Sequence, residues 1–549
     1  MNVFKLVLPC VGLFAFISAT KAQDKGRLSG NVQIMAQTYQ EDSLIGAIAP
    51  DEKMASNAFA NLRYTYGNFE AGIRFEAYQP ALLGYPARFE GTGLSRKFIS
   101  YKNDKLEVTF GNFFDQFGSG LIFRSYEEPN LGIDNAMDGY RVLYRPLKGV
   151  TLKGIYGQQR FAFNNRLINT DNIIRAIDAE VNVNSFFQEE LPFTLNIGGS
   201  FLSKYQRDDS PNYRLPENVA SYGGRFDFYM GKFSVSGEFV EKMNDPSADN
   251  GFIYKKGQAV LANFGYSQKG LGFQFSAKST DNMSLRSDRN MGLTDLMVNF
   301  NPALTKTHTY NLAATLYPYA TNLNGEVAFQ SDLIYQFKKG TLLGGKYGTS
   351  VNVNYAVAYD INKSYLDPDN DPGNINNTTR IFDANMDSVF VKDFNIEVKK
   401  KINKKLKMKA TYFNEVFNAD ANLVSTSKGM IYYHIGVLDV SYKLARKHNI
   451  RAEAQGLFTN QDKQDWATAV VEYTYSPHWF VGIMDQFNYG NNIEDQRIHY
   501  LIGSVGYING ANRISLSYGR QREGIFCVGG VCRAVPAANG LALTITSSF

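Results

Sequence analysis

Charged side chains of both signs are concentrated in one glycine-rich and aromatic-rich stretch, GNFFDQFGSGLIFRSYEEPNLGIDNAMDGYR, residues 111–141. Opposed acidic and basic groups at the narrowing of a pore create a field that selects among solutes. The residue types therefore favour a selective constriction. A surface loop held by its own ion pairs, or a docking site for a partner, are the alternatives. The candidate constriction residues are Asp115, Arg124, Glu127, Glu128, Asp134, Asp138 and Arg141.

Two cysteines flank a short glycine-containing turn in the sequence REGIFCVGGVCRAVP. Cys527 and Cys532 are separated by VGGV, and two glycines allow a tight reversal that can bring the sulfurs together. We expect a disulfide. Free thiols, or a metal bound by both thiolates, are the alternatives.

Carboxylates alternate in the sequence DPDNDPG, where Asp367, Asp369 and Asp371 resemble the start of a calcium-binding loop. However, Pro372 stands where such a loop needs glycine, and Thr378 stands where it needs a bidentate glutamate. An ordinary acidic surface loop is therefore favoured over a weak metal site. We expect no metal and no other cofactor.

The histidines form no recognisable catalytic motif, because they are scattered and two of them fall at expected turns. A catalytic pair formed across strands remains the alternative, but the sequence favours a protein that is not an enzyme. The five histidines are His308, His434, His448, His478 and His499.

The elements that must position these groups are indicated by period-two alternation of apolar and polar residues. FANLRYTY, residues 59–66, is followed by Gly67-Asn68 and then by the alternating run FEAGIRFEAY. Each such pair of runs predicts a β-hairpin. The composition agrees, because 34 Tyr and 40 Phe favour strands and 48 Gly favour turns.

Short turns alternate with longer polar connections, so one end of an up-and-down sheet carries turns and the other carries loops. Twelve short turns, with both chain ends on their side, predict about 26 strands, in a range of about 24–28. The turns are expected near residues 67, 103, 148, 188, 231, 269, 302, 343, 403, 447, 476 and 509.

The leader of the chain predicts export. Residues 1–22 contain Lys5, an apolar run and a small-residue exit, which is the pattern of a signal peptide. Loss of Lys5 and Lys21 lowers the formal net charge from +5 to +3, which gives no support for binding nucleic acid. Residues 23–549 are then expected to form a single domain.

The last nine residues, LALTITSSF, alternate an apolar face with a small polar one and end at Phe549. Backbone groups in lipid need partners within the protein, so a spanning sheet must close, and we expect this strand to pair with the first. The predicted fold is an all-β, transmembrane, antiparallel up-and-down β-barrel with short periplasmic turns and long extracellular loops. The aromatic end resembles the signal by which the barrel-assembly machinery recognises outer-membrane proteins.

The connection 115–138 is long enough to enter such a barrel. Its 24 residues reach about 80 Å when extended. The arrangement resembles that of general porins, in which a third loop folds inside as a charged constriction.

The motif FFDQFGSGLIFRSYEEPNLGIDNAMDG, together with REGIFCVGGVCRAVP, resembles a large outer-membrane β-barrel family of the Bacteroidota. The resemblance runs along the mature chain. It implies a porin-like barrel in the outer membrane of a Gram-negative bacterium, and it implies no established activity.

A barrel of this size would be on the order of 50 Å wide, and an open hole of that width would defeat the membrane barrier. The sequence favours passage of small polar solutes through a lumen narrowed by loop 115–138. The alternative is a non-channel scaffold or subunit of a larger outer-membrane complex for secretion or assembly, with other outer-membrane proteins as partners.

Overall fold

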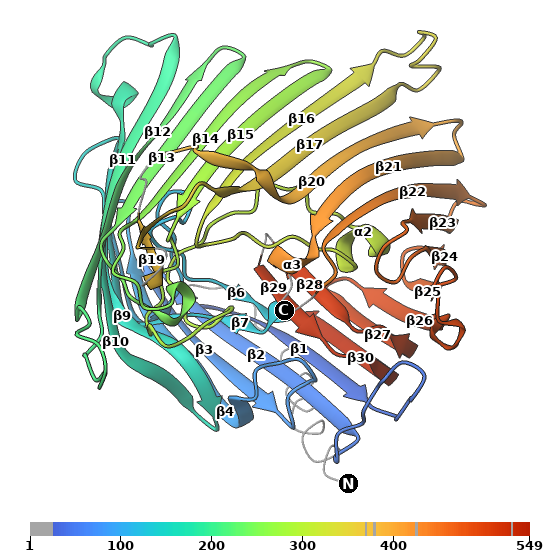
Figure 1. Ribbon diagram of the computed structural model, residues 1–549, viewed down its shortest axis with the longest axis horizontal. Helices are drawn as coiled ribbons and strands as arrows, with labels where there is room; N and C mark the ends of the chain where they lie inside the picture. The colour runs from blue at the N-terminus through green and yellow to red at the C-terminus, as the bar shows by residue number, and fades with distance from the viewer. Residues whose placement is uncertain (1–25, 368–370, 377–379, 423–426, 529–530) are drawn as a thin grey trace.

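A closed antiparallel sheet of 24 strands forms the wall of the molecule in the computed structural model (Figure 1). The structure describes residues 26–549 except 368–370, 377–379, 423–426 and 529–530. The expected leader, residues 1–22, lies outside the described residues. The all-β barrel predicted from alternation is confirmed.

The wall strands of the first half are β1 (Arg27–Thr38), β2 (Met54–Tyr66), β3 (Phe69–Tyr78), β4 (Phe89–Lys102), β5 (Leu106–Phe113), β8 (Met137–Tyr144), β9 (Val150–Asn164), β10 (Leu167–Asn182), β11 (Phe193–Tyr205), β12 (Asn218–Met230), β13 (Phe233–Lys242) and β14 (Gly257–Gln268). Those of the second half are β15 (Leu271–Asp281), β16 (Glu326–Phe337), β17 (Thr349–Ile361), β20 (Ala384–Lys401), β21 (Leu406–Asn418), β22 (Met430–Lys443), β23 (His448–Phe458), β24 (Trp466–Tyr475), β25 (Trp479–Phe487), β26 (His499–Asn509), β27 (Asn512–Gln521) and β30 (Ala538–Ser548).

The remaining elements belong to the connections between wall strands. Three small hairpins are β6 (Glu127–Glu128) with β7 (Ile133–Asp134), β18 (Ser364–Asp367) with β19 (Asp371–Asn376), and β28 (Gly524–Val528) with β29 (Val531–Val535). The helical pieces are α2 (Asn311–Thr315), α3 (Ala419–Asn422), η1 (Pro129–Leu131), η2 (Val183–Phe186), η3 (Ala248–Asn250) and η4 (Glu494–Gln496). Within the described residues, no helix has the length and apolar character needed to cross a bilayer.

The sheet closes where the first strand meets the last. β1 pairs with β2 on one side and with β30 on the other, in a register that runs from Asn31 opposite Ser548 to Gln37 opposite Ala542. This pairing confirms the closure expected from the C-terminal alternation. It leaves the wall without an unpaired edge, as a sheet in lipid requires.

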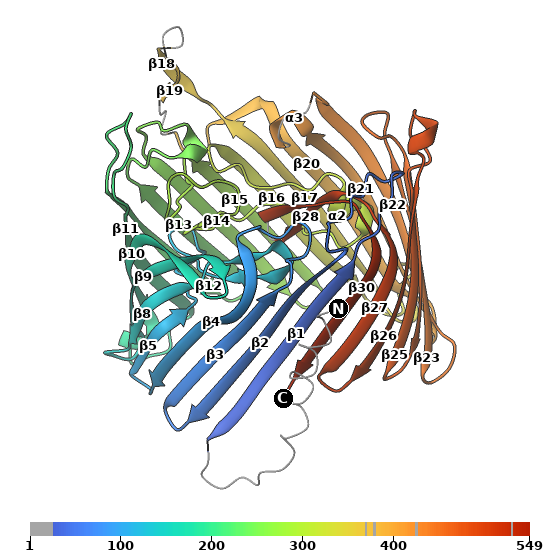
Figure 2. The same cartoon turned by 90° about the horizontal axis from the view of Figure 1, so that it is seen from below.

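Short turns gather at the end of the wall where β30 stops, and the β18–β19 hairpin projects from the opposite end (Figure 2). Gly67, Gly231 and Gly510 take the left-handed backbone conformation in three of these turns, with φ of 56°, 57° and 59°. Glycine adopts this conformation without the steric cost that a Cβ atom imposes, which explains its place in the tight hairpins.

The wall has fewer strands than the 26 predicted from the sequence, because one of the twelve expected turns does not join two wall strands. Eleven of the twelve turns lie between paired strands, but the region near residue 302 does not. It belongs to a connection, residues 282–325, that joins β15 to β16 and carries only the short helix α2. Removing that hairpin from the sequence prediction lowers the count to the observed 24.

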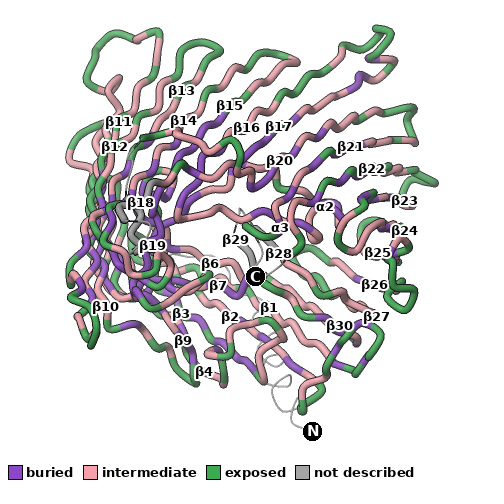
Figure 3. Tube along the Cα trace, in the orientation of Figure 1, coloured by how far each residue is buried: buried purple, intermediate pink, exposed green. Residues whose placement is uncertain are grey.

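The two faces of the wall differ in chemistry. On β3 the side chains of Phe69, Ile73 and Phe75 are exposed on the outer face, whereas the alternate side chains of Arg74 and Glu76 are buried inside. Strict alternation of this kind is expected when one face meets lipid and the other lines the interior. Buried positions lie along the strand bodies, and the hairpin turns at the rims are exposed (Figure 3).

Candidate functional site

Two connections enter the ring of wall strands and contact each other (Figures 1 and 2). We call residues 114–136, between β5 and β8, the first inward segment, and residues 282–325, between β15 and β16, the second inward segment. The amide N of Arg124 donates to the carbonyl O of Val298 over 2.8 Å, and the amide N of Phe300 donates to that of Gly120 over 2.9 Å. Backbone hydrogen bonds therefore join the two segments directly.

An apolar core fills the contact between the two inward segments. Phe117, Leu121 and Phe123 of the first segment pack with Leu285 and Val298 of the second, and none of the five is more than 1% exposed. Complete burial of a large apolar side chain contributes about 1.5–3 kcal/mol relative to its exposed state. The pair of segments is thus a packed body inside the wall.

Wall lysines hold the second inward segment. Nζ of Lys242 on β13 donates to the carbonyl O of Ser284 over 2.6 Å, and Nζ of Lys278 on β15 donates to that of Pro302 over 2.5 Å. Lys278 also forms an ion pair of 2.7 Å with Glu326. These buried ammonium groups are paired inside the barrel, as a charge removed from water requires.

The first inward segment is held by a buried arginine of the wall. On β9, Arg160 forms ion pairs with Glu76 of β3 over 2.7 Å and with Asp134 of the segment over 2.6 Å. The side chains of Arg160 and Glu76 are fully buried. Charge-assisted hydrogen bonds of this kind fix geometry as well as contribute energy, so Asp134 is tied to one place on the wall.

Glu127 of the first inward segment joins the same cluster. Its carboxylate contacts Arg74 over 2.6 Å and Arg96 over 2.7 Å. Burial, the largest effect, raises the pKa of Glu127 to about 7 although the charge of Arg74 opposes the shift, and the nearby charge of Asp134 adds to it. Glu127 is therefore a member of the cluster that can exchange a proton near neutral pH.

A second ion-pair group lies at the base of the first inward segment. Asp115 contacts Arg141 of β8 and, over 3.0 Å, Nζ of Lys153 on β9. Arg141 also pairs with Glu107 of β5. Asp115 and Arg141, two of the residues proposed from sequence, are thus brought into direct contact.

The other proposed constriction residues lie apart from one another. The guanidinium carbon of Arg124 stands 4.1 Å from the ring centre of Phe300 in the second segment. Asp138 is the second residue of β8 and accepts a hydrogen bond of 2.8 Å from Asn169. Glu128 pairs within the β6–β7 hairpin. The seven residues therefore form two charged groups and separate contacts rather than one ring.

A cavity of about 770 Å³ lies on the short-turn side of the first inward segment. Both signs of charge line it, and its lining side chains include Arg63, Glu70, Lys102, Glu107 and Arg141. A recess of this size that carries charges of both signs can admit hydrated small solutes.

One group that sequence reasoning missed involves a histidine. His308 of the second inward segment lies beside Asp393 of β20 and Glu415 of β21. No local spacing in the sequence announces it, because 85 residues separate the histidine from Asp393. The other four histidines lie on wall strands or at a turn.

Two other sequence predictions fall on parts of the chain that are only partly described. The side chains of Cys527 and Cys532 lie outside the described residues, but their backbones are directly opposite in the β28–β29 register, so the disulfide stays a prediction. The β28 strand contacts both α2 and η1. The side chains of Asp367, Asp369 and Asp371 also lie outside the described residues.

A closed wall of 24 antiparallel strands, apolar outside and charged inside, defines a large β-barrel of the outer-membrane type. The chain belongs to a family of unknown function, DUF6029, whose model matches residues 3–549. No curated protein matches its sequence.

Several solved structures are similar to this chain at low identity. A mutant of the ferric enterobactin receptor PfeA from Pseudomonas aeruginosa is 10% identical, with a TM-score of 0.41 over 97% of this chain and 81% of that chain. The siderophore receptor PirA from Acinetobacter baumannii is 10% identical, with a TM-score of 0.41 over 97% of this chain and 81% of that chain. The outer membrane protein OpdK from Pseudomonas aeruginosa is 11% identical, with a TM-score of 0.37 over 83% of this chain and 99% of that chain.

Proposed function

We propose that the protein is a porin-like channel of the outer membrane, in which the two inward segments narrow the lumen and small polar solutes pass beside them. On this proposal the chain is exported through the leader 1–22 and has no catalytic role. The Gram-negative, Bacteroidota setting follows the sequence resemblance.

The charged cavity beside the first inward segment carries the proposal. A wall of 24 strands encloses a width on the order of 50 Å, which must be restricted if the membrane is to remain a barrier. The inward segments supply that restriction, while the 770 Å³ cavity retains polar space along the wall. Charges of both signs line this space, from Arg63, Glu70, Glu107 and Arg141.

Single-channel recording in planar bilayers tests this function. The purified chain should conduct, and replacing residues 115–138 by a short glycine–serine link should raise its conductance. The rise should be limited, because the second inward segment still occupies the lumen. Replacing residues 492–497, an exposed part of the β25–β26 connection, is the control and should leave the conductance unchanged. A silent chain, or equal conductance in all three proteins, contradicts the proposal.

The apolar contact between the inward segments favours a second candidate function. Phe117, Leu121 and Val298 belong to one apolar cluster inside the wall, and each is almost completely buried. A filled barrel suits a scaffold or subunit of a larger outer-membrane secretion or assembly complex. This candidate predicts a chain that is silent alone and that crosslinks to the same outer-membrane partners in native membranes, as identified by mass spectrometry.

The C-terminal strand supports a proposal about biogenesis. β30 presents Leu541, Leu543 and Ile545 on the apolar face and ends next to Phe549. We propose that the barrel-assembly machinery recognises this strand. Truncation of Phe549 should lower the amount of folded barrel in the outer membrane and leave the amount of synthesised chain unchanged.

A further inference from the structure

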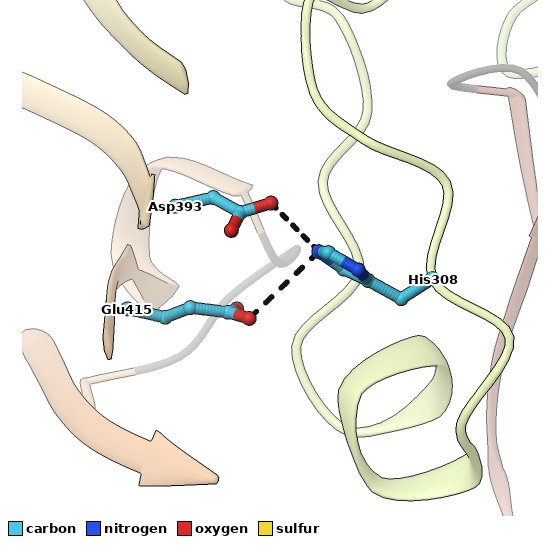
Figure 4. A group of neighbouring side chains, drawn as sticks. All are labelled: His308, Asp393 and Glu415. Atoms are coloured by element: carbon cyan, nitrogen blue, oxygen red, sulfur yellow. Dashed lines mark hydrogen bonds and ion pairs between the residues drawn. The ribbon is translucent and has the colours of Figure 1, made fainter. Parts of the chain in front are cut away.

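We propose that His308, Asp393 and Glu415 form a binding site for one zinc ion, which joins the second inward segment to the barrel wall. The three side chains converge from the segment, from β20 and from β21 (Figure 4). One imidazole nitrogen and two carboxylate oxygens are ligands that borderline divalent metals accept.

The distances are close to those of a metal centre. Nε2 of His308 makes a hydrogen bond of 2.7 Å with Oδ2 of Asp393, which a bound ion would replace, and it lies 3.8 Å from Oε1 of Glu415. All three candidate ligand atoms lie within 4.8 Å of one another. Ligands at the 2.0–2.2 Å typical of zinc stand about 3.4 Å apart in a tetrahedron. Only small side-chain shifts are needed to surround an ion.

One ligand atom is buried and lacks a hydrogen-bond partner. Oε1 of Glu415 accepts no hydrogen bond from the described residues, and Glu415 is only 4% exposed. A buried carboxylate oxygen left unpaired is costly, and a cation bound at this point would remove that cost. This atom faces His308 (Figure 4).

The other oxygen of each carboxylate is already held in place. The hydroxyl of Tyr433 donates to Oε2 of Glu415, and Nδ2 of Asn395 donates to Oδ1 of Asp393 over 2.8 Å. Each acid therefore directs one oxygen toward His308 and fixes the other. Such outer hydrogen bonds are typical of metal sites, where they orient the ligands.

The surrounding charge and space also suit a cation. Lys306 is a positive group near the site, but its Nζ donates to Asn352 over 3.2 Å and to Asn395 over 3.1 Å and forms no ion pair with Asp393 or Glu415 among the described residues. A neutral His308 with two carboxylates leaves two negative charges, which a divalent ion balances. A cavity of about 90 Å³ adjoins the three ligands and has room for water to complete the coordination.

The consequence is mechanical. An ion held by His308 on one side and by Asp393 and Glu415 on the other crosslinks the second inward segment to neighbouring wall strands. Metal binding and solute passage are separate properties. A negative result in the zinc titration therefore does not contradict the proposed channel, and a silent channel does not contradict the zinc site.

Zinc titration of the full chain in detergent, after removal of metals with a chelator, tests the site. We expect one equivalent to bind, and cobalt in its place to give the visible absorption of a low-symmetry site. Glu415→Gln, which keeps the shape and removes a buried charge, should weaken zinc binding at least about 10-fold. Tyr433→Phe, which frees one carboxylate oxygen, should weaken it by about 10-fold.

His499→Ala is the matched control, because His499 also pairs with an aspartate, Asp485, over 2.6 Å but on an exposed part of the wall. Zinc binding should be unchanged in this variant. Heat-dependent mobility in gel electrophoresis verifies that each variant is a folded barrel. Absence of saturable binding, or equal affinity in the wild type and Glu415→Gln, overturns the proposal.

Discussion

Arg160 is the residue on which the attachment of the first inward segment depends. Its guanidinium contacts Glu76 and Asp134. Replacement by methionine removes that shared partner, so that Glu76 keeps its ion pair with Arg74 over 2.7 Å and Asp134 keeps only the longer contact with Arg96 over 3.7 Å. Loss of one member of a buried ion pair costs about 3–5 kcal/mol. We therefore expect Arg160→Met to lower the free energy of unfolding by about this amount, measured by urea titration of the barrel in lipid bilayers.

Arg63→Met is the control for that variant. Arg63 pairs with Glu70 over 3.2 Å, but 59% of its side chain is exposed. Exposed ion pairs contribute about 0–1 kcal/mol, so this change should be nearly neutral. Equal effects of the two substitutions would show that water reaches Arg160 in the folded barrel.

Glu127 makes the attachment dependent on pH. Its pKa in the folded state is raised from 4.5 to about 7, so the attached segment binds a proton that a detached, solvated segment has released. Between these two values the folded state holds more protons, and its stability falls as the pH rises. Proteolysis within the first inward segment should therefore be faster at pH 8 than at pH 5, after correction for the protease's own pH profile.

Glu127→Gln isolates that contribution. Glutamine keeps the size of the side chain and cannot titrate, so the variant should lose the pH dependence that Glu127 causes. A wild-type segment that becomes easier to cleave toward pH 5 would show that the ion pairs with Arg74 and Arg96 outweigh burial.

At the scale of elements, the strands were predictable and the inward segments were only partly so. Alternation along a strand is local, so runs such as 59–66 identify both the element and the face that turns outward. The second inward segment has no period, and a turn near 302 was the wrong prediction for it. Its folding is set by Lys242, Lys278 and other distant wall groups that no local pattern contains.

The partners of the charged side chains were also not predictable from local sequence. The sequence indicated that 111–141 was unusual in charge, but the partners of Glu127 and Asp134 lie on β3, β4 and β9. Only the strand order brings those arginines to the segment. The His308 group is a stronger case, since its three members come from separate stretches of chain.

Asn299 provides a test of the contact between the inward segments. Its Nδ2 donates to the carbonyl O of Leu121 over 3.2 Å and to that of Met283 over 2.8 Å, and its Oδ1 accepts from the amide of Leu285 over 3.1 Å. Asn299→Leu removes all three bonds, at about 1–3 kcal/mol for each buried group left without a partner. We expect faster proteolysis of both segments while the wall remains folded.

Asn290→Leu serves as the comparison, because Asn290 lies in the same segment and is exposed. Its cleavage pattern should match that of the wild type. If the cleavage pattern of Asn299→Leu also matches, the hydrogen bonds of Asn299 are not needed to hold the two segments in place.

At the scale of the whole molecule, the outer surface and the interior of the wall differ in chemistry, and each needs a matching environment. Large apolar side chains cover the outside, and the interior holds paired charges and polar groups. An aqueous exterior would leave that apolar surface in water, whereas a bilayer would cover it. The orientation of the side chains, more than their number, therefore assigns the outer face to lipid.

Neighbouring residues of β25 test that assignment. Ile483 is exposed on the outer face, and Met484 points inward. A lysine facing the middle of the bilayer costs about 2–4 kcal/mol, while a lysine in the lumen remains hydrated. We expect Ile483→Lys to lower the stability of the barrel in lipid vesicles by this amount and Met484→Lys to change it much less, both measured by urea unfolding. Since the two positions are adjacent, strand propensity and depth are nearly matched, and only the face differs. Equal costs at both positions would mean that hydrocarbon does not contact the outer face, and the channel proposed for this barrel would then have no membrane to cross.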